Sequence, residues 1–228
     1  MKWQQLPAIS APMSFQMALD EILFRSQKEK PQDPVLRFYV SSEPWISAGY
    51  SFRDDDDLRK SDLIRKNPGV PVCRRITGGG CVNHGDDLIF SLTGRIQTDP
   101  ENFNSVRMSY QKIHEAVKAG LEPFGFHVTC YGEEDELPKG SDCFDFPVES
   151  DLAWKGKKIA GGAQKRSEGV FLHHESVLIP SGISREELMR SIRSGLEKVF
   201  AVSIKTVEMD PALYFQAEKS PWKNRQVI

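Results

Sequence analysis

The chain is poor in cysteine, with four in 228 residues, and these four form no CxxC pair. They stand at positions 73, 81, 130 and 143. The spacing of Cys73, Cys81 and His84 matches no standard zinc pattern, and no fourth ligand is evident nearby. We therefore expect free thiols in a reducing compartment, the cytoplasm, and no metal site.

An excess of basic residues is also absent. The chain has 30 Lys and Arg against 32 Asp and Glu, a formal net charge of -2, so we do not expect a nucleic-acid partner. No run of about 18 apolar residues is present, and Met1 to Leu6 lacks the pattern of a signal peptide, so we expect no membrane association. The aspartates of RDDDDLRK, residues 53–60, lack the ordered spacing of a calcium loop, and we expect the solvated start of a short helix there.

Internal repeats, strict alternation of strands and helices, and a Rossmann fingerprint are all missing. The pattern predicts an α+β fold, a mixed and largely antiparallel sheet flanked by helices, in one domain over residues 1–228 without a separate accessory domain. Three helices are predicted. One begins at Ser14, which we expect to be its cap, and one spans 105–121, where Gly120 and Pro123 end it. The third begins at the capping box of Ser184. Strands are predicted at 35–40, 44–52, 127–131, 149–154, 158–163, 169–172 and 176–180, the last four as a meander of short strands around a turn at 155–157.

The densest chemical signal is RRITGGGCVNH at 74–84. Three consecutive glycines let the backbone approach a ligand closely, and Arg74 or Arg75 can supply a bidentate charge to an anionic group. A tight turn explains three bare glycines equally well, but the two flanking arginines and the histidine downstream favour a binding loop. His84 can orient a substrate or act as a base, although a structural role is common for a single histidine.

The second signal is CFDFPVESDLAWKGKKIAGGAQKR at 143–166, which places a cysteine before a predicted hairpin and Lys158 at the start of a strand of small residues. A free thiol has a pKa of about 8.5, so a nearby ammonium group would raise its thiolate fraction. Taken alone, Cys143 could be a small buried hydrophobe and Lys158 a solvated side chain.

Together these segments resemble the biotin/lipoate protein ligase superfamily, within it the branch of lipoate ligases and cysteine-dependent octanoyltransferases. RRITGGGCVNH resembles the RRxTGGGxVxH signature, and GKKIAGGAQKR resembles the GxKxxGxAxxR element. FQMALDEILF, PWISAGYSF and HHESVLI are looser matches, and HHESVLI carries Glu175 where the family usually has glycine. The biotin-ligase sequence GRGRxxR is absent. The resemblance implies the catalytic-domain fold of that superfamily, which is similar to class II synthetases.

The resemblance also implies roles for individual residues. Cys143 is similar to the nucleophile of the octanoyltransferases, and Lys158 is similar to the lysine that contacts the acyl carbonyl or, in ligases, the acyl-adenylate. Cys81, beside the glycines, is the alternative nucleophile. The residues expected to bind substrate are Arg74, Arg75, Thr77, Gly78, Gly79, Gly80, His84, Gly161, Gly162 and Ala163.

The leading hypothesis is an acyltransferase without a cofactor. It would move an octanoyl or lipoyl group through a Cys143 thioester, from an acyl carrier protein or another octanoyl donor, to a lysine of a lipoyl-domain or glycine-cleavage H-type protein. Two alternatives stay open at this point. One is a lipoate-protein ligase that uses ATP and magnesium, and the other is a non-catalytic module that binds acyl groups or lipoyl domains.

Overall fold

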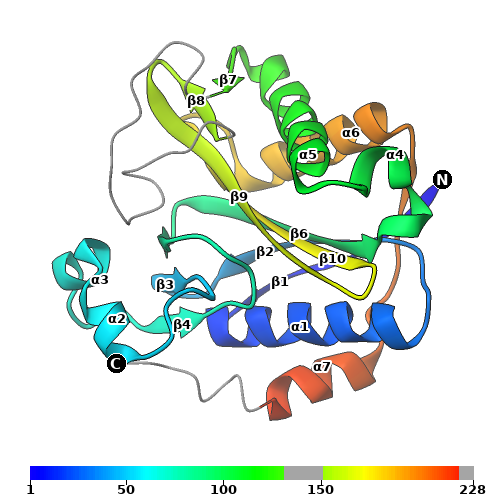
Figure 1. Cartoon of the computed structure of the whole chain (residues 1–228). Coiled ribbons are helices and arrows are strands. Elements are labelled where there is room, and N and C mark those ends of the chain that lie inside the picture. Colours follow the sequence, from blue (N-terminus) through cyan, green and yellow to red (C-terminus); the bar gives the residue numbers. More distant parts are fainter. Residues whose placement is uncertain (131–150, 221–228) are drawn as a thin grey trace.

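The fold is built on an eight-stranded sheet with a three-stranded sheet beside it (Figure 1). The computed structural model describes residues 1–130 and 151–220. The strands of the large sheet lie in the order β11-β1-β2-β6-β10-β9-β8-β7, and those of the small sheet in the order β4-β3-β5. β1 pairs in parallel with β11 and β2, and all other neighbours in the large sheet are antiparallel. The predicted α+β fold with a mixed, largely antiparallel sheet is confirmed.

The elements have the following bounds. The strands are β1 Lys2–Ala11, β2 Val35–Ser41, β3 Trp45–Ala48, β4 Val72–Arg74, β5 Cys81–His84, β6 Asp87–Arg95, β7 Thr129–Cys130, β8 Leu152–Trp154, β9 Lys157–Ser167, β10 Val170–Leu178 and β11 Ser203–Thr206. The helices are α1 Met13–Glu29, α2 Asp55–Arg59, α3 Asp62–Lys66, α4 Pro100–Phe103, α5 Val106–Leu121, α6 Arg185–Phe200 and α7 Pro211–Lys219, with short 3-10 turns at Ile96–Thr98 and Glu122–Phe124.

Helices cover both faces of the large sheet. In Figure 1, α5 and α6 lie on one face, α1 lies on the other, and α7 packs outside α1. The main core fills the space between the sheet and the α5–α6 pair, where Phe103 stacks on Phe171 with ring centroids 4.3 Å apart. The small sheet and the short helices α2 and α3 lie together at one end of the molecule (Figure 1).

The predicted helices are present, but the start of the first one differs. α1 begins after Pro12 and Ser14 is buried inside the helix, so the prediction of Ser14 as the cap was wrong. α5 ends at Leu121, as predicted, and Gly120 in its last turn is buried against the backbone of Ile192 on α6. The capping box of Ser184 is confirmed at the start of α6.

Two predictions about strands were wrong. The segments 169–172 and 176–180 belong to one strand, β10, because the polar residues between them are buried and paired rather than exposed in a turn. The predicted strand at 44–52 ends at Ala48, and the chain then turns toward the glycine loop. The turn between β8 and β9 is confirmed at Lys155 and Gly156, which both have positive φ.

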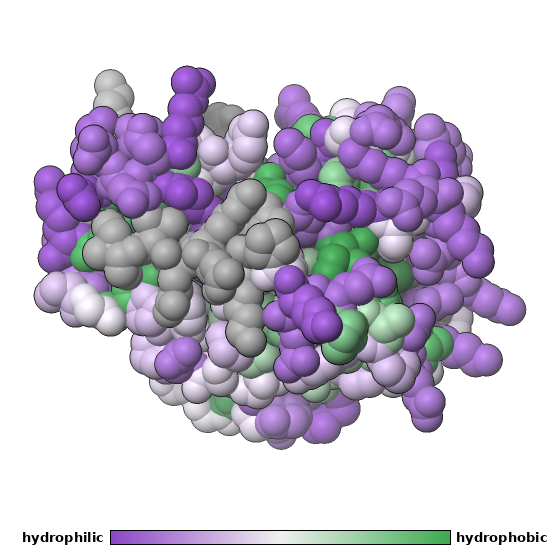
Figure 2. Space-filling model, turned by 90° about the horizontal axis from the view of Figure 1, so that it is seen from below, coloured by the Kyte–Doolittle hydropathy of each residue, from purple (hydrophilic) through white to green (hydrophobic). Residues whose placement is uncertain are grey.

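The surface on the side of α1 and α7 is mostly hydrophilic, with small separate hydrophobic areas where it is not covered by grey atoms (Figure 2). Tyr214 and Phe215 of α7 are exposed. Within residues 1–130 and 151–220, none of the helices has the length and apolar character needed to cross a membrane.

Candidate active site

A pocket of roughly 390 Å³, counted with the open space at its mouth, lies where α1 and the small sheet meet β9 and β10 of the large sheet. One part of its wall is apolar, with Met13 and Met17 from α1 and Ile89 from β6. The full lining is Met13, Met17, Tyr39, Ser47, Arg75, Val82, His84, Ile89, Gly161, Gly162, Ala163, His174, Glu175 and Ser176. An apolar wall with a few polar groups is typical of a site for a small amphipathic ligand.

Arg75 shapes the glycine loop, because its guanidinium group is buried and donates hydrogen bonds to the loop backbone. One terminal nitrogen donates to the carbonyl oxygens of Gly78 at 2.7 Å and Gly80 at 2.9 Å. The other donates to the carbonyl and the hydroxyl of Ser47, both at 3.0 Å. Arg74 points elsewhere and forms an ion pair with Asp55 at 3.1 Å.

The loop also packs tightly against the end of β3. A Cβ atom on Gly49 would lie 1.9 Å from the carbonyl oxygen of Gly79, so no larger residue fits there without moving the loop. Gly79 has a φ of 89°, which side-chain-bearing residues rarely adopt. These glycines therefore set the path of the backbone beside the pocket.

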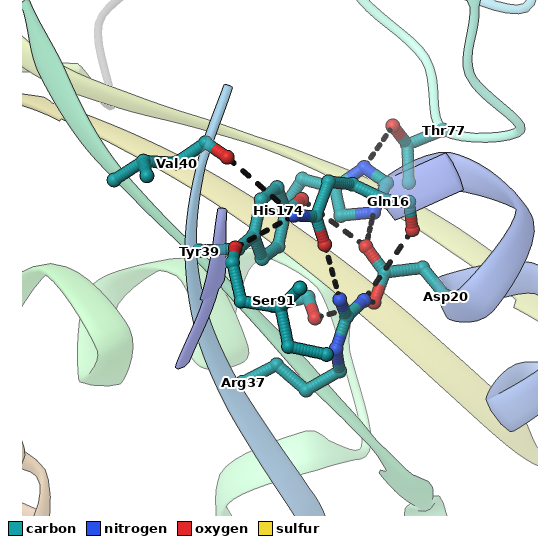
Figure 3. A network of polar contacts seen from close by, with 9 residues as sticks. Gln16, Asp20, Arg37, Tyr39, Val40, Thr77, Ser91 and His174 are labelled. Carbon is teal, nitrogen blue, oxygen red and sulfur yellow. Dashed lines mark hydrogen bonds and ion pairs between the residues drawn. The ribbon is translucent and has the colours of Figure 1, made fainter. Parts of the chain in front are cut away.

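Asp20 of α1 is the centre of a buried network (Figure 3). It forms an ion pair with Arg37 and accepts a hydrogen bond from Ser91 at 2.7 Å. Its other oxygen lies 3.0 Å from His174 Nε2, and His174 Nδ1 lies 2.9 Å from Thr77 of the glycine loop. Burial alone would raise the pKa of Asp20, but Arg37, His174 and Ser91 together lower it to about 2.

A second buried chain of contacts runs through His84. His84 Nε2 lies 2.8 Å from Ser47 Oγ, and His84 Nδ1 lies 2.7 Å from Asp87 Oδ2. Ser176 donates to the same Asp87 oxygen at 2.6 Å. Burial opposes ionisation of Asp87, but the contacts with His84 and Ser176 lower its pKa below the ordinary value.

Lys158 lies beside the pocket, paired with Asp151. Its Nζ is 2.7 Å from Asp151 Oδ2, and both side chains are nearly fully buried. A Cβ atom on Gly161 would come within 2.6 Å of Asp151 Oδ1 and 2.7 Å of Lys158 Nζ. The absence of a side chain at Gly161 therefore leaves the space that the ion pair occupies.

Glu175 continues the polar lining toward α5. Its carboxylate lies 2.7 Å from His173 Nε2 and 3.3 Å from His114 Nε2. Burial would raise the pKa of Glu175, but the two histidines lower it to about 2. A Cβ atom on Gly162 would lie 2.5 Å from Glu175, so this glycine also makes room for a buried charge.

Of the thiols that the structure describes, Cys73 and Cys81 are buried and Cys130 is partly exposed. Cys143 lies outside the described residues. Cys81 is fully buried among the apolar residues of the small sheet. Cys73 is also buried, and burial raises its pKa to about 12, so this thiol stays protonated near neutral pH. In residues 1–130 and 151–220, no group of three or more His, Cys, Asp or Glu side chains could hold a metal ion.

The fold brings several predicted site residues together and leaves others at the edge. Arg75, His84, Gly161, Gly162 and Ala163 line the pocket. Gly78 and Gly80 accept hydrogen bonds from Arg75, and the hydroxyl of Thr77 lies within hydrogen-bond distance of His174. The side chain of Arg74 turns toward α2 instead.

Sequence reasoning missed five polar residues that complete the site. These are Asp20, Ser47, Asp87, Asp151 and His174. Only the tertiary fold pairs Asp20 with His174. Two spacings were available as signals, because Asp87 stands three positions after His84 and Asp151 stands seven positions before Lys158, across the predicted hairpin.

The mixed sheet and the partly apolar pocket with a buried lysine define a protein that handles small amphipathic ligands. Residues 12–209 match the model of the lipoyl protein ligase A/B catalytic domain, so the chain belongs to that family. Octanoyltransferase LipM of Bacillus subtilis (strain 168) is 31% identical over 230 residues, covering 92% of this chain and 82% of that protein. Octanoyltransferase LipM of Moorella thermoacetica is 33% identical over 168 residues, covering 72% of this chain and 60% of that protein.

The fold has relatives among solved structures as well. A crystal structure of lipoate-protein ligase A bound with ATP matches with a TM-score of 0.74 and 21% identity, covering 98% of each chain. At that identity the likeness establishes the fold, which is the lipoate-ligase fold predicted from the motifs.

Proposed function

We propose that this protein is an octanoyltransferase that moves an octanoyl group from a carrier thioester to a lysine of a lipoyl-domain protein. The observation that carries the proposal is the buried Lys158–Asp151 pair at Gly161, on the edge of a pocket whose wall is partly apolar. The two octanoyltransferase relatives and the family support the same chemistry.

In the proposed reaction, the thiolate of Cys143 attacks the thioester carbonyl of the octanoyl carrier. The new carbon–sulfur bond forms at Cys143, the bond to the carrier sulfur breaks, and the carrier thiolate takes up a proton. The lysine amine of the acceptor then attacks the acyl-enzyme, forms the amide bond and releases the Cys143 thiol. Splitting the transfer in this way lets one pocket hold the octanoyl chain in both steps.

Lys158 is the group proposed to stabilise the charge that develops on the carbonyl oxygen in each step. Asp151 holds Nζ in place at 2.7 Å and compensates its charge inside the protein. The lack of side chains at Gly161 and Gly162 leaves the room that Lys158, Asp151 and Glu175 occupy beside the pocket. Met13, Met17 and Ile89 are suited to contact the hydrocarbon chain.

We propose that this transfer needs no nucleotide, whereas ATP and magnesium would be required if the protein activated free lipoate. The partners are an octanoyl carrier protein as donor and a lipoyl domain as acceptor. They are proposed from the resemblance and the family.

Intact-mass spectrometry after incubation with octanoyl carrier protein tests the proposal. The wild type should gain one octanoyl group, Cys143→Ser should gain none, and Cys130→Ser should behave as the wild type. Addition of a lipoyl domain should then move the octanoyl mass to that domain without ATP.

Two results would overturn the proposal. One is the absence of an octanoyl adduct that depends on Cys143. The other is modification of the lipoyl domain only when free acid and ATP are supplied, which would assign the protein as a ligase.

A further inference from the structure

Ser47, His84 and Asp87 are connected in the order of a serine–histidine–aspartate triad. They come from β3, β5 and β6, so the fold brings them together across the boundary of the two sheets. Ser47 Oγ lies 2.8 Å from His84 Nε2, and His84 Nδ1 lies 2.7 Å from Asp87 Oδ2. Both distances fall in the range expected of a nucleophile, its base and the group that orients the base.

The neighbours of the triad fix the direction of its hydrogen bonds. Arg75 can only donate, and it donates to Ser47 Oγ at 3.0 Å. The Asp87 carboxylate can only accept, so it takes the hydrogen of His84 Nδ1, and in neutral His84 the other nitrogen, Nε2, accepts the hydroxyl hydrogen of Ser47. His84 then carries its own hydrogen on Nδ1 and donates it to the Asp87 carboxylate, which is the tautomer that an activated serine requires.

The triad also faces the pocket proposed to hold the acyl chain. Ser47 and His84 both belong to the lining, together with Met17, Val82 and Ile89. The guanidinium group of Arg75 favours negative charge on Ser47 Oγ. Ser47, His84 and Asp87 take no part in the transfer proposed through Cys143 and Lys158.

We propose that Ser47 is a second acyl-accepting nucleophile and that this protein hydrolyses medium-chain acyl thioesters through it. The inference rests on the proposed function in one respect, that the pocket receives an octanoyl chain. It adds a hydrolytic activity that releases the acyl group as free acid when no acceptor lysine is present.

The chemistry balances with water as the co-reactant. Ser47 Oγ forms a bond to the acyl carbonyl carbon while its proton passes to His84 Nε2. The carbon–sulfur bond of the thioester breaks, and the leaving thiolate takes that proton. Water then attacks the serine ester, gives a proton to His84, and releases the free fatty acid as the proton returns to Ser47 Oγ.

The test is covalent labelling of the full chain with ethyl octylphosphonofluoridate, a probe that exchanges its P–F bond for a P–O bond with an activated serine. Intact-mass spectrometry should show one ethyl octylphosphonyl group, and peptide mapping should place it on Ser47. Ser47→Ala should lose the label, while Ser26→Ala should keep it, because the hydroxyl of Ser26 on α1 donates to the backbone carbonyl of Leu23 in the same helix. Asp87→Asn should slow labelling at least about tenfold, because it removes the acceptor that fixes the His84 tautomer.

A second measurement uses the octanoyl thioester of N-acetylcysteamine with Cys143→Ser, in which the proposed cysteine route is closed. Release of octanoate should continue and should fall to the background rate when Ser47→Ala is added. An unlabelled Ser47 in the wild type, or equal octanoate release with and without Ser47, overturns the inference.

The two proposals fail separately. Octanoylation of Cys143 without a Ser47 adduct would contradict the proposed hydrolase activity and support the proposed transferase activity. A Ser47 adduct without an octanoylated Cys143 does the reverse.

Discussion

Asp20 and Arg37 are charged side chains with almost no solvent contact, with 0% and 2% of their side-chain surfaces exposed. Removing one partner of a buried pair leaves the other charge uncompensated, at a cost of about 3–5 kcal/mol. We therefore expect Asp20→Asn to lower the free energy of unfolding by that amount at pH 7, measured by urea denaturation. Glu115→Gln, which breaks an exposed pair with Lys112, should cost less than about 1 kcal/mol.

The Asp20–Arg37 pair also predicts that the free energy of unfolding depends on pH. The pKa of Asp20 is about 2 in the folded protein and 3.8 in its ordinary state, so its stabilising contribution is complete above about pH 4. It is lost as the pH falls through 2, which corresponds to about 2 kcal/mol. The difference in the free energy of unfolding between the wild type and Asp20→Asn should therefore be constant from pH 7 to 5 and become smaller below pH 4. A difference that stays constant down to pH 2.5 would contradict this.

Asp151 provides the residue-scale prediction for the reaction. It holds Lys158 through a charge-assisted hydrogen bond of 2.7 Å, an interaction worth about 1.5–3 kcal/mol. If that energy is used to place Nζ at the reacting carbonyl, Asp151→Asn should slow octanoyl transfer roughly 10- to 100-fold. The KM for the octanoyl carrier should change less than about twofold, because the carrier does not bind through this side chain.

Steady-state kinetics with octanoyl carrier protein and a lipoyl domain checks this prediction. Glu115→Gln serves again as a control that removes an exposed carboxylate that does not line the pocket. A transfer rate of Asp151→Asn within twofold of the wild type would show that Lys158 needs no such support.

At the scale of elements, glycine decides how closely α5 and α6 approach. A Cβ atom on Gly195 of α6 would lie 2.2 Å from the carbonyl oxygen of Ala116 on α5, and one on Gly120 would lie 2.7 Å from Ile192 Cα. Since both obstacles are backbone, the helices must separate to accept a methyl group. Gly195→Ala should therefore destabilise the protein by about 1–3 kcal/mol, seen as a lower Tm.

The neighbouring Ser194 is exposed on the same helix and gives the matched control. Ser194→Ala adds no atom to the interface and slightly favours the helix, so it should change stability by less than about 0.5 kcal/mol. A Gly195→Ala variant that is as stable as Ser194→Ala would mean that the two helices can shift apart at no cost.

How well the elements could be predicted depends on where their polar residues lie. α6 could be predicted from its sequence, because the capping box marks its start and the apolar residues at helical spacing mark its buried face. β10 was divided into two strands because His173, His174 and Glu175 interrupt its apolar pattern, and nothing local reveals that each has a buried partner. β1 was not predicted, since the run WQQLPAIS mixes amides with a proline and owes its place to parallel neighbours far along the chain.

Some residues of the candidate site could likewise be predicted from the sequence, and others could not. The glycine loop and Lys158 are recognisable because each lies in a compact motif. Asp87 stands only three positions after its partner His84, whereas the contact of Asp20 with His174 spans 154 positions. A pairing of that length arises from the tertiary fold, which the local pattern does not contain.

For the molecule as a whole, the pocket depends on how the glycine loop and small sheet are held against the large sheet. Thr77 supplies one link, since its hydroxyl lies 2.9 Å from Nδ1 of His174 on β10. His174 in turn contacts Asp20, so the link also joins the glycine loop to α1. Loosening it should let the small sheet open as a unit while the large sheet stays closed.

Thr77→Val tests this link, because valine keeps the shape of threonine and removes only the hydroxyl. Leaving a buried histidine nitrogen without its partner should cost about 1–3 kcal/mol. Amide hydrogen exchange should accelerate in β3, β4 and β5 and stay unchanged in β6 and β10. Thr93→Val is the matched control, because Thr93 Oγ1 is buried with no hydrogen-bond partner among the described residues. That variant should be neutral or more stable by up to about 1 kcal/mol, and uniform faster exchange in both sheets of Thr77→Val would show that they open together.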